Sequence, residues 1–221
     1  ALGSYYGYVA DGYFQSQEEI DMADCVYGGN KANIKPGYIR YVDVNHDGEI
    51  NSKDRVILGN STPRYEYSFT LGGQWKGIDL SLFFQGVGKR DLYYSGAGAR
   101  PLVQNSTIFK SQLDTWSPEN PDAEYPLLLV DAGSTNMNNI VSSFWIKSGA
   151  YLRLKNLTVG YTLPKKWTNR VSIDNLRLYF TASNLFTINN GYKGYDPETG
   201  VTSGAMYPVM KTFNFGINLD F

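Results

Sequence analysis

A run of oxygen-bearing side chains between residues 43 and 54 is the part of the sequence best suited to chemistry. Acidic and amide side chains alternate there and are followed by Gly48, as at positions 1, 3, 5 and 6 of the 12-residue EF-hand calcium loop. Calcium binds about six to eight oxygen atoms, and alternating side chains on a tight loop direct several of them to one point. The pattern predicts a structural calcium site formed by Asp43, Asn45, Asp47, Glu49 (through its backbone carbonyl) and Asp54.

Two features separate this loop from a complete EF-hand. The last ligand position holds Asp54, which is shorter than the usual glutamate, and no amphipathic helix precedes Asp43. An Asx-rich turn ahead of a short strand is the alternative, because Asp, Asn and Gly favour turns for local reasons. If calcium binds, we expect it to brace the loop, because there are no flanking helices to transmit a conformational switch.

The remaining candidate chemistry is sparse. Asp196 and Glu198 could supply the carboxylate pair of a glycosidase, but Pro197 between them favours a loop turn capped by Asp196. The single cysteine, Cys25, permits neither an internal disulfide nor a Cys-based zinc site. The single histidine, His46, leaves almost no material for His-dependent catalysis. We therefore expect no enzymatic activity.

Aromatic side chains gather near the start of the chain and could bind a sugar or a peptide by stacking. An interfacial aromatic girdle or ordinary strand packing would explain the same pattern equally well, and the three interpretations stay open. The side chains concerned are those of Tyr5, Tyr6, Tyr8, Tyr13 and Phe14.

The composition indicates an all-β protein with long loops. The 221 residues include 18 Tyr, 11 Phe and 23 Gly, while charged residues make up only 19%. With 20 basic and 21 acidic residues the net charge is -1, so we expect no nucleic-acid binding. No apolar run of about 18 residues is present, which argues against a transmembrane helix. The chain begins with Ala and shows no signal peptide, and we expect the gene product to begin further upstream.

Five segments alternate between apolar and polar residues, as strands with two different faces do. The clearest is the last, in which Phe213, Phe215, Ile217, Leu219 and Phe221 alternate with polar residues or Gly. Its length suits a tilted membrane-spanning strand of about 9–11 residues, although the final strand of a soluble sandwich would alternate in the same way. The segments are 65–71, 78–85, 151–163, 176–186 and 213–221.

The connections between these segments alternate between short and long. Short links at 72–77 and 164–175 alternate with long ones at about 86–150 and 188–210. Bacterial outer-membrane barrels alternate short periplasmic turns with long extracellular loops in this way. Five strands cannot close a barrel, because the smallest class has about eight strands, so the pattern predicts part of a larger protein.

Many short motifs in this order resemble the C-terminal part of the SusC/RagA-type TonB-dependent transporters of Gram-negative outer membranes. Each motif is weak alone, but their order and number are specific. They are Gly7–Ser16, Gly37–Gly48, Asp54-Arg55, Gly59–Pro63, Lys76–Ser81, Gln85-Gly86, Tyr151–Pro164, Ser183–Thr187, Gly194–Glu198 and Tyr207-Pro208, followed by the terminal strand.

The resemblance implies an antiparallel transmembrane β-barrel of about 22 strands, closed by an N-terminal plug. It also implies TonB-driven import of oligosaccharides or peptides, with a SusD-like surface lipoprotein as a lid. Residues 1–64 would form an extracellular region that carries the calcium loop, and residues 65–221 the C-terminal barrel strands with their long loops. Outer-membrane lipid and the remainder of the barrel would surround these strands. Neither the plug nor a TonB-contacting segment matches this sequence.

A second interpretation is a secreted, calcium-stabilised β-sandwich that binds glycan through exposed Tyr and Trp side chains. Dependence on detergent separates the two, because barrel strands expose apolar surface to lipid and a sandwich buries it.

Overall fold

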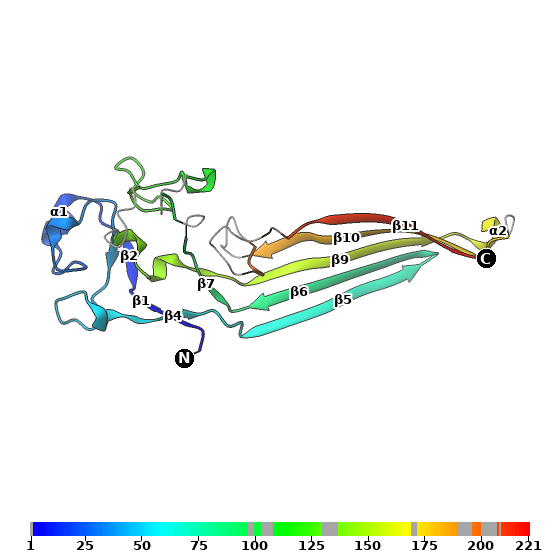
Figure 1. Cartoon of the computed structure of the whole chain (residues 1–221), viewed down its shortest axis with the longest axis horizontal. Coiled ribbons are helices and arrows are strands. Elements are labelled where there is room, and N and C mark those ends of the chain that lie inside the picture. Colours follow the sequence, from blue (N-terminus) through cyan, green and yellow to red (C-terminus); the bar gives the residue numbers. More distant parts are fainter. Residues whose placement is uncertain are drawn as a thin grey trace.

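The computed structural model describes residues 2–96, 100–102, 108–129, 137–168, 172–189, 196–199, 207 and 209–221. An irregular lobe and a long, curved antiparallel sheet lie end to end (Figure 1). The sheet has the strand order β11-β10-β9-β6-β5, so that β9 is central. Its strands are β5 (Tyr65–Trp75), β6 (Ile78–Gly88), β9 (Tyr151–Thr162), β10 (Asn175–Asn189) and β11 (Thr212–Asp220).

The five predicted strand segments all lie in this sheet, with one correction at the first turn. The sequence placed that turn at 72–77, whereas β5 continues to Trp75 and the turn consists of Lys76 and Gly77 alone. Both turn residues have positive φ, 48° and 86°, which is the two-residue hairpin that matches the twist of paired strands. Gly72 and Gly73 therefore extend the strand, although glycine pairs usually signal a turn.

Register explains why the alternation in 151–163 is imperfect. Phe83 pairs with Asn156 but the next residue of β6, Phe84, pairs with Leu154, so that Lys155 is an extra residue in β9. A shift of one residue exchanges the two faces of a strand. The bulge at Lys155 therefore puts Leu154 and Leu157 on the same face, although they are an odd number of residues apart.

The lobe contains the short elements that precede β5 and that connect β6 to β9. Strands β1 (Ser4–Gly7) and β4 (Val56–Asn60) pair with each other, as do β2 (Ala10–Tyr13) and β3 (Ile39–Tyr41), and β7 (Asp91–Tyr93) and β8 (Ile146–Ser148). Helix α1 spans Gln17–Met22, and single 3-10 turns lie at Lys31–Asn33, Ser52–Asp54, Lys110–Gln112, Met137–Asn139 and Ser143–Trp145.

The core of the molecule lies in the lobe. Two clusters of buried side chains fill it, the larger mostly aromatic and the smaller mostly aliphatic, and Trp145 and Ile20 are among the least exposed. Helix α1 begins where the Ser16 hydroxyl accepts a hydrogen bond from the Glu19 N–H, which caps the helix and turns Ile20 inward. The lobe is thus packed like a soluble domain.

The structure describes the two long connections to different extents. The one predicted at 86–150 enters the lobe through β7 and β8, apart from residues 97–99, 103–107 and 130–136, which lie outside the described residues. Most of the connection predicted at 188–210 also lies outside the described residues.

The short link 164–175 contains α2 (Lys165–Thr168), at the end of the sheet away from the lobe (Figure 1). Among the described residues, no helix is long and apolar enough to cross a membrane.

Candidate functional site

One face of the five-stranded sheet is apolar from edge to edge. Cross-strand partners share a face, so the register assigns each side chain without ambiguity. Many of these side chains are exposed, with Phe215 at 84% and Trp75 at 68%. The face consists of Tyr65, Tyr67, Phe69, Leu71 and Trp75 on β5; Ile78, Leu80, Leu82 and Phe84 on β6; Leu152, Leu154, Leu157, Val159 and Tyr161 on β9; Leu176, Leu178, Phe180, Ala182, Phe186 and Ile188 on β10; and Phe213, Phe215, Ile217 and Leu219 on β11.

This apolar face has the dimensions of a lipid contact. From Tyr65 to Trp75 the strand advances ten steps of about 3.3 Å, or about 33 Å. A tilt of about 40° reduces that to about 25 Å along the membrane normal, which is the height of the apolar band of outer-membrane barrels. Among the described residues, no second sheet packs against this face, as a β-sandwich would require.

The opposite face of the sheet is polar. Its middle consists mainly of uncharged hydroxyl and amide side chains, interrupted by the rings of Phe83 and Tyr179. Hydrogen bonds link neighbouring strands across it, for example from Ser183 to Asn156 at 3.1 Å. The polar side chains include Ser68, Thr70 and Gln74 on β5; Ser81 and Gln85 on β6; Asn156 and Thr158 on β9; Thr181, Ser183 and Thr187 on β10; and Asn214 and Asn218 on β11.

Charged side chains on the polar face form two groups, and the first lies at the lobe end. Arg153, only 3% exposed, contacts Asp196 at 2.6 Å and Glu198 at 2.5 Å, and its Nε donates to the Thr187 hydroxyl. Lys155, directed here by the bulge, contacts Glu198 at 2.8 Å. These contacts hold the turn of residues 196–199 against β9.

This arrangement bears on the glycosidase interpretation. Asp196 accepts a hydrogen bond from the Glu198 N–H at 2.9 Å, as expected of a residue that caps a turn. Both carboxylates are also engaged by cations, with Glu198 shared between Arg153 and Lys155. In this structure the two carboxylates therefore hold the turn of residues 196–199 against β9.

The second charged group lies near the turn end of the sheet. Arg177 on β10 contacts Asp79 on β6 through two hydrogen bonds, at 2.9 and 2.6 Å, and so reaches across β9. The residue beneath this ion pair is Gly160, where a Cβ atom would stand closer than 3.0 Å to both side chains. Glycine is therefore required at this position if the pair is to keep its geometry.

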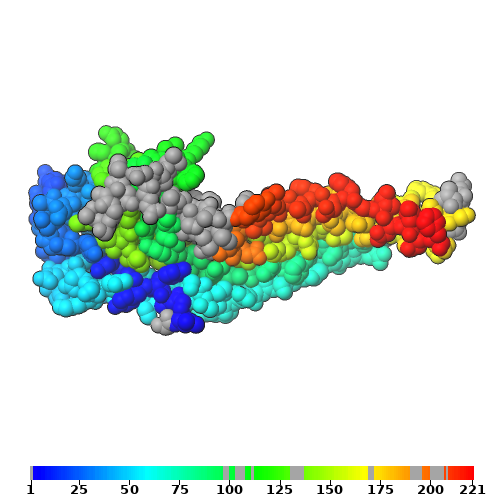
Figure 2. All heavy atoms as spheres, in the orientation of Figure 1, coloured from blue at the N-terminus to red at the C-terminus, as the bar shows by residue number. Residues whose placement is uncertain are grey.

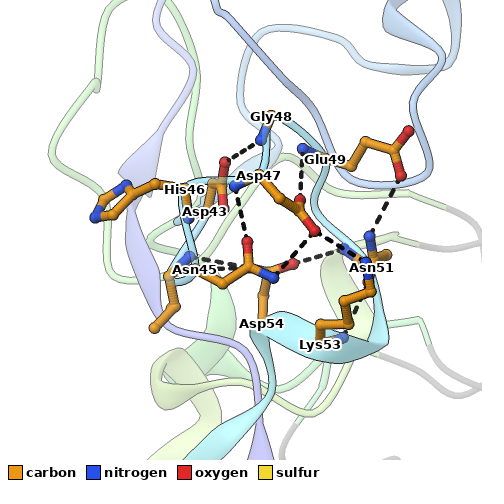
Figure 3. Close-up of polar contacts among 10 residues, drawn as sticks. Asp43, Asn45, His46, Asp47, Gly48, Glu49, Asn51, Lys53 and Asp54 are labelled. Carbon is orange, nitrogen blue, oxygen red and sulfur yellow. Dashed lines mark hydrogen bonds and ion pairs between the residues drawn. The ribbon is translucent and has the colours of Figure 1, made fainter.

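The predicted calcium loop is compact and internally hydrogen-bonded (Figure 3). The Asp43 carboxylate accepts from the N–H groups of His46 and Gly48, both at 2.8 Å. The Asn45 side chain accepts from the Asp47 N–H at 2.9 Å, and the Asp47 carboxylate from the Glu49 N–H at 3.1 Å. Three of the predicted ligand residues are thus directed into the loop by its own backbone.

Two further features shape the loop: the burial of Asp54 and an ion pair between Lys53 and Asp47. Asp54 is fully buried, and its two oxygens accept from the N–H groups of Val44, Asn45 and Asn51. Burial opposes the ionisation of Asp54, but these donors outweigh it and hold the pKa of its carboxyl group below the ordinary value. Lys53 lies 3.1 Å from Asp47, and its hydrogen bond lowers the pKa of that carboxyl group.

In this conformation the loop is a capped turn. Among the described residues, no three or more His, Cys, Asp or Glu side chains are grouped closely enough to hold a metal ion. The predicted ligand atoms of the loop are nevertheless all oxygens, which are the ligands that calcium prefers. Calcium binding therefore stays a prediction.

The amino-terminal aromatics are distributed between core and surface. Tyr8, Tyr13 and Phe14 are buried in the lobe, which is the strand-packing interpretation. Tyr5 is half-buried, with its ring centroid 6.0 Å from that of Tyr93, and Tyr6 is exposed beneath the guanidinium of Arg55. A stacking surface formed by all five is thus excluded.

Sequence reasoning missed both charged groups on the polar face. The signal was present, because Arg153, Lys155 and Arg177 interrupt otherwise apolar strand patterns. Their carboxylate partners could not be identified, since Asp79 is 98 residues from Arg177 and Glu198 is 45 from Arg153.

The chain is similar over its whole length to portions of known outer-membrane receptors. No protein-family profile matches it. TonB-dependent receptor P3 of Formosa agariphila is 32% identical over a 240-position alignment that covers 100% of this chain and 22% of the relative. TonB-dependent receptor SusC of Bacteroides thetaiotaomicron is 28% identical, with 97% and 20% covered. The chain thus spans about a fifth of the length of the curated relatives it matches.

Solved structures show the same fold. The RagAB peptide importer in its 'closed-closed' state has a TM-score of 0.66 and 25% identity, covering 99% of this chain and 23% of that one. The same importer in its 'open-open' state has a TM-score of 0.67 and 21% identity, and the match covers 100% of this chain and 23% of that one. At this identity the likeness shows the fold alone. The five-stranded sheet is therefore a fragment of a larger outer-membrane barrel. With 25–32% identity over nearly its whole length to TonB-dependent receptor P3, SusC and the closed-closed RagAB importer, the chain is similar to a portion of the SusC/RagA-type TonB-dependent receptors of the Gram-negative outer membrane.

Proposed function

We propose that this chain forms five neighbouring strands of the barrel wall of a TonB-dependent transporter, with the lobe outside the cell. The apolar face would contact lipid, and the polar face would line the interior. The observation that carries this assignment is the division of all five strands into one apolar and one polar face. The edges at β5 and β11 would continue into further strands of the barrel.

Neighbouring residues on β5 provide the test. In the full-length transporter, with Cys25 and any other cysteine replaced, Phe69→Cys and Thr70→Cys place a thiol on opposite faces. In membranes, a water-soluble maleimide should label Thr70→Cys and leave Phe69→Cys unlabelled until detergent denatures the barrel. Equal labelling of both thiols before denaturation would contradict the proposed orientation.

A second labelling experiment tests whether the lobe is extracellular. Residues 1–64 and the connection 86–150 would be extracellular, because both short links lie at the opposite end of the sheet (Figure 1). Glu49→Cys, at an exposed position of the loop, should react with an impermeant maleimide on intact cells. Lys166→Cys in α2 should react only after the outer membrane is opened. The reverse pattern would invert the assignment.

The transported substrates would be oligosaccharides or peptides, imported with a SusD-like surface lipoprotein as a lid and driven by TonB through parts of the protein outside this chain. Similarity to SusC and to the RagAB peptide importer supports this proposal. Deleting the gene should abolish uptake of one labelled glycan or peptide class, and the full-length gene should restore it. Co-purification of a SusD-like lipoprotein with the full-length transporter tests the partner. If no such lipoprotein co-purifies, the proposal of a lid is wrong.

We further propose that the loop of residues 43–54 binds calcium as a brace. Asp43, Asn45 and Asp47 would bind through side-chain oxygens and Glu49 through its carbonyl, while Asp54 would need to release backbone N–H groups to take part. In the full-length protein, Asp47→Ala should lower the stability of the lobe in calcium but have little effect in chelator. Equal losses in both conditions would mean that the loop is only a turn.

A further inference from the structure

Exposed lysine and tryptophan side chains lie on both of the connections at the turn end of the sheet. Lys76 forms half of the β5–β6 turn, and Lys165 and Lys166 lie in α2. Trp75 and Trp167 beside them are 68% and 59% exposed. The Thr162 N–H donates to the Gly77 carbonyl at 2.8 Å, which fixes the β5–β6 turn beside the end of β9, three residues before α2 begins.

The register places Trp75 and the adjoining Lys76 at the border of the apolar face. Trp75 is the last residue of β5 on that face, and its cross-strand partner is Ile78. The Lys76 ammonium group lies 4.6 Å from the centroid of the Trp75 ring, where the electrons of the ring attract a cation. If the apolar face spans about 25 Å of hydrocarbon, the Trp75 ring lies at its boundary and Lys76 lies among the lipid headgroups.

Lys76, Lys165 and Lys166 are all exposed. None of them contributes to an ion pair in the part of the chain that the structure describes. Asp79, the nearest acid in sequence to Lys76, is held by Arg177 on the polar face. The undescribed residues directly after α2 read Asn, Arg and Val, so they supply no carboxylate either.

We propose that Lys76, Lys165 and Lys166, flanked by Trp75 and Trp167, form a contact surface for the phosphate groups of anionic phospholipids in the leaflet at the turn end of the barrel. This rests on the orientation given under the proposed function. The tryptophan rings fix the depth of the surface in the membrane, and the unpaired ammonium groups attract phosphate. Anionic lipid would therefore accumulate at this arc of the barrel.

The experiment uses the full-length transporter in nanodiscs that contain phosphatidylcholine with a minority of phosphatidylglycerol. After extraction into mild detergent, mass spectrometry measures the phosphatidylglycerol that stays bound relative to its share in the nanodisc. We expect an enrichment that falls by about fivefold or more in the triple variant Lys76→Gln, Lys165→Gln and Lys166→Gln. Arginine at the same three positions should retain it.

Removal of positive charge at the other end of the molecule, by two lysines instead of three, is the control. Lys35→Gln with Lys110→Gln removes two exposed cations from the lobe and should leave the enrichment unchanged. An unchanged enrichment in the triple glutamine variant would overturn the proposal, as would an equal loss in the control.

An error in the proposed orientation of the two sheet faces would be recognised separately from an error in the lipid contact. If the orientation is wrong, the maleimide would label Phe69→Cys and Thr70→Cys equally, whatever the result for phosphatidylglycerol. If those thiols label as expected and the glutamine variant still retains phosphatidylglycerol, only the lipid contact is wrong.

Discussion

The lobe and the sheet use the same kinds of aromatic side chain in opposite ways. In the lobe, the rings point inward and their polar atoms find partners: the Tyr41 hydroxyl donates to the Met137 carbonyl at 2.7 Å, and the Trp145 Nε1 to the Asn138 carbonyl at 2.7 Å. In the sheet, Phe213 and Phe215 point outward, with more than half of each side chain exposed. The comparison teaches that one chain is built for two solvents, water around the lobe and hydrocarbon around the sheet.

Two tryptophans give the largest expected contrast. Trp145 is 1% exposed and packs edge-on against Phe144 at a centroid distance of 4.9 Å, so Trp145→Ala should destabilise the lobe by about 3–5 kcal/mol. Trp75→Ala, at the exposed end of β5, should leave the lobe unaffected. Limited proteolysis of the full-length transporter, which reports local opening of the lobe, is the measurement. Equal protease sensitivity of the two variants would erase the distinction.

Adjacent residues on β11 give the next contrast. Phe215→Arg places a charge on the lipid side and should destabilise the barrel by about 2–4 kcal/mol, whereas Asn214→Arg, on the polar side, should cost about 1 kcal/mol or less. Denaturant unfolding in detergent or lipid, followed by the change in gel mobility of the barrel, measures both. Similar losses would mean that the two faces do not experience different solvents.

Alkaline pH should lower the stability of the lobe, because the lobe contains buried tyrosines. Burial raises the pKa of Tyr13 and Tyr41 above the ordinary value of 10.0. The unfolded state then releases the proton first, so lobe stability is complete below about pH 10 and falls as the pH rises further. An alkali-stable protease should cut the lobe faster at about pH 11 than at about pH 8. Tyr13→Phe should weaken that dependence, while Tyr6→Phe, at an exposed position, should leave it unchanged.

The smallest effect concerns the polar face alone. Gly160→Ala should displace the Asp79–Arg177 ion pair and cost about 1 kcal/mol, because the pair is partly exposed. In a background with Asp79→Ser and Arg177→Ser the same substitution should cost almost nothing, which a double-mutant cycle detects. A cost that persists in this background would show that glycine is needed for the strand itself.

The long strands were predictable because lipid and lumen impose a strict period of two on the sequence. The pattern fails at the bulge of Lys155, where the backbone departs from regular pairing. It also fails at Gly72 and Gly73, which pair regularly in β5 but carry no side chain to show the alternation. The short strands of the lobe carry no such period, since β2 and β3 are three or four residues long and are held by packing. Packing between distant segments cannot be inferred from local alternation.

The candidate site was predictable only in part, for the same reason. The loop of residues 43–54 is local, so the direction of Asp43, Asn45 and Asp47 into it follows from spacing. The contact of Arg153 with Asp196 joins a strand to a loop 43 residues away, and the sequence contains no local sign of that partnership. The burial of Asp54 beneath three N–H donors was likewise invisible, because the turn at Ser52–Asp54 creates it.

The two outer strands of the sheet have a consequence for the way this chain is produced. Within the described residues, β5 pairs only with β6, and β11 only with β10. Each therefore presents a long row of free backbone donors and acceptors beside phenylalanine and leucine side chains, which is a template for further strands. A chain of this length made alone in water should therefore add copies of itself edge to edge and aggregate. Correct assembly depends on the neighbouring strands arriving before such copies do.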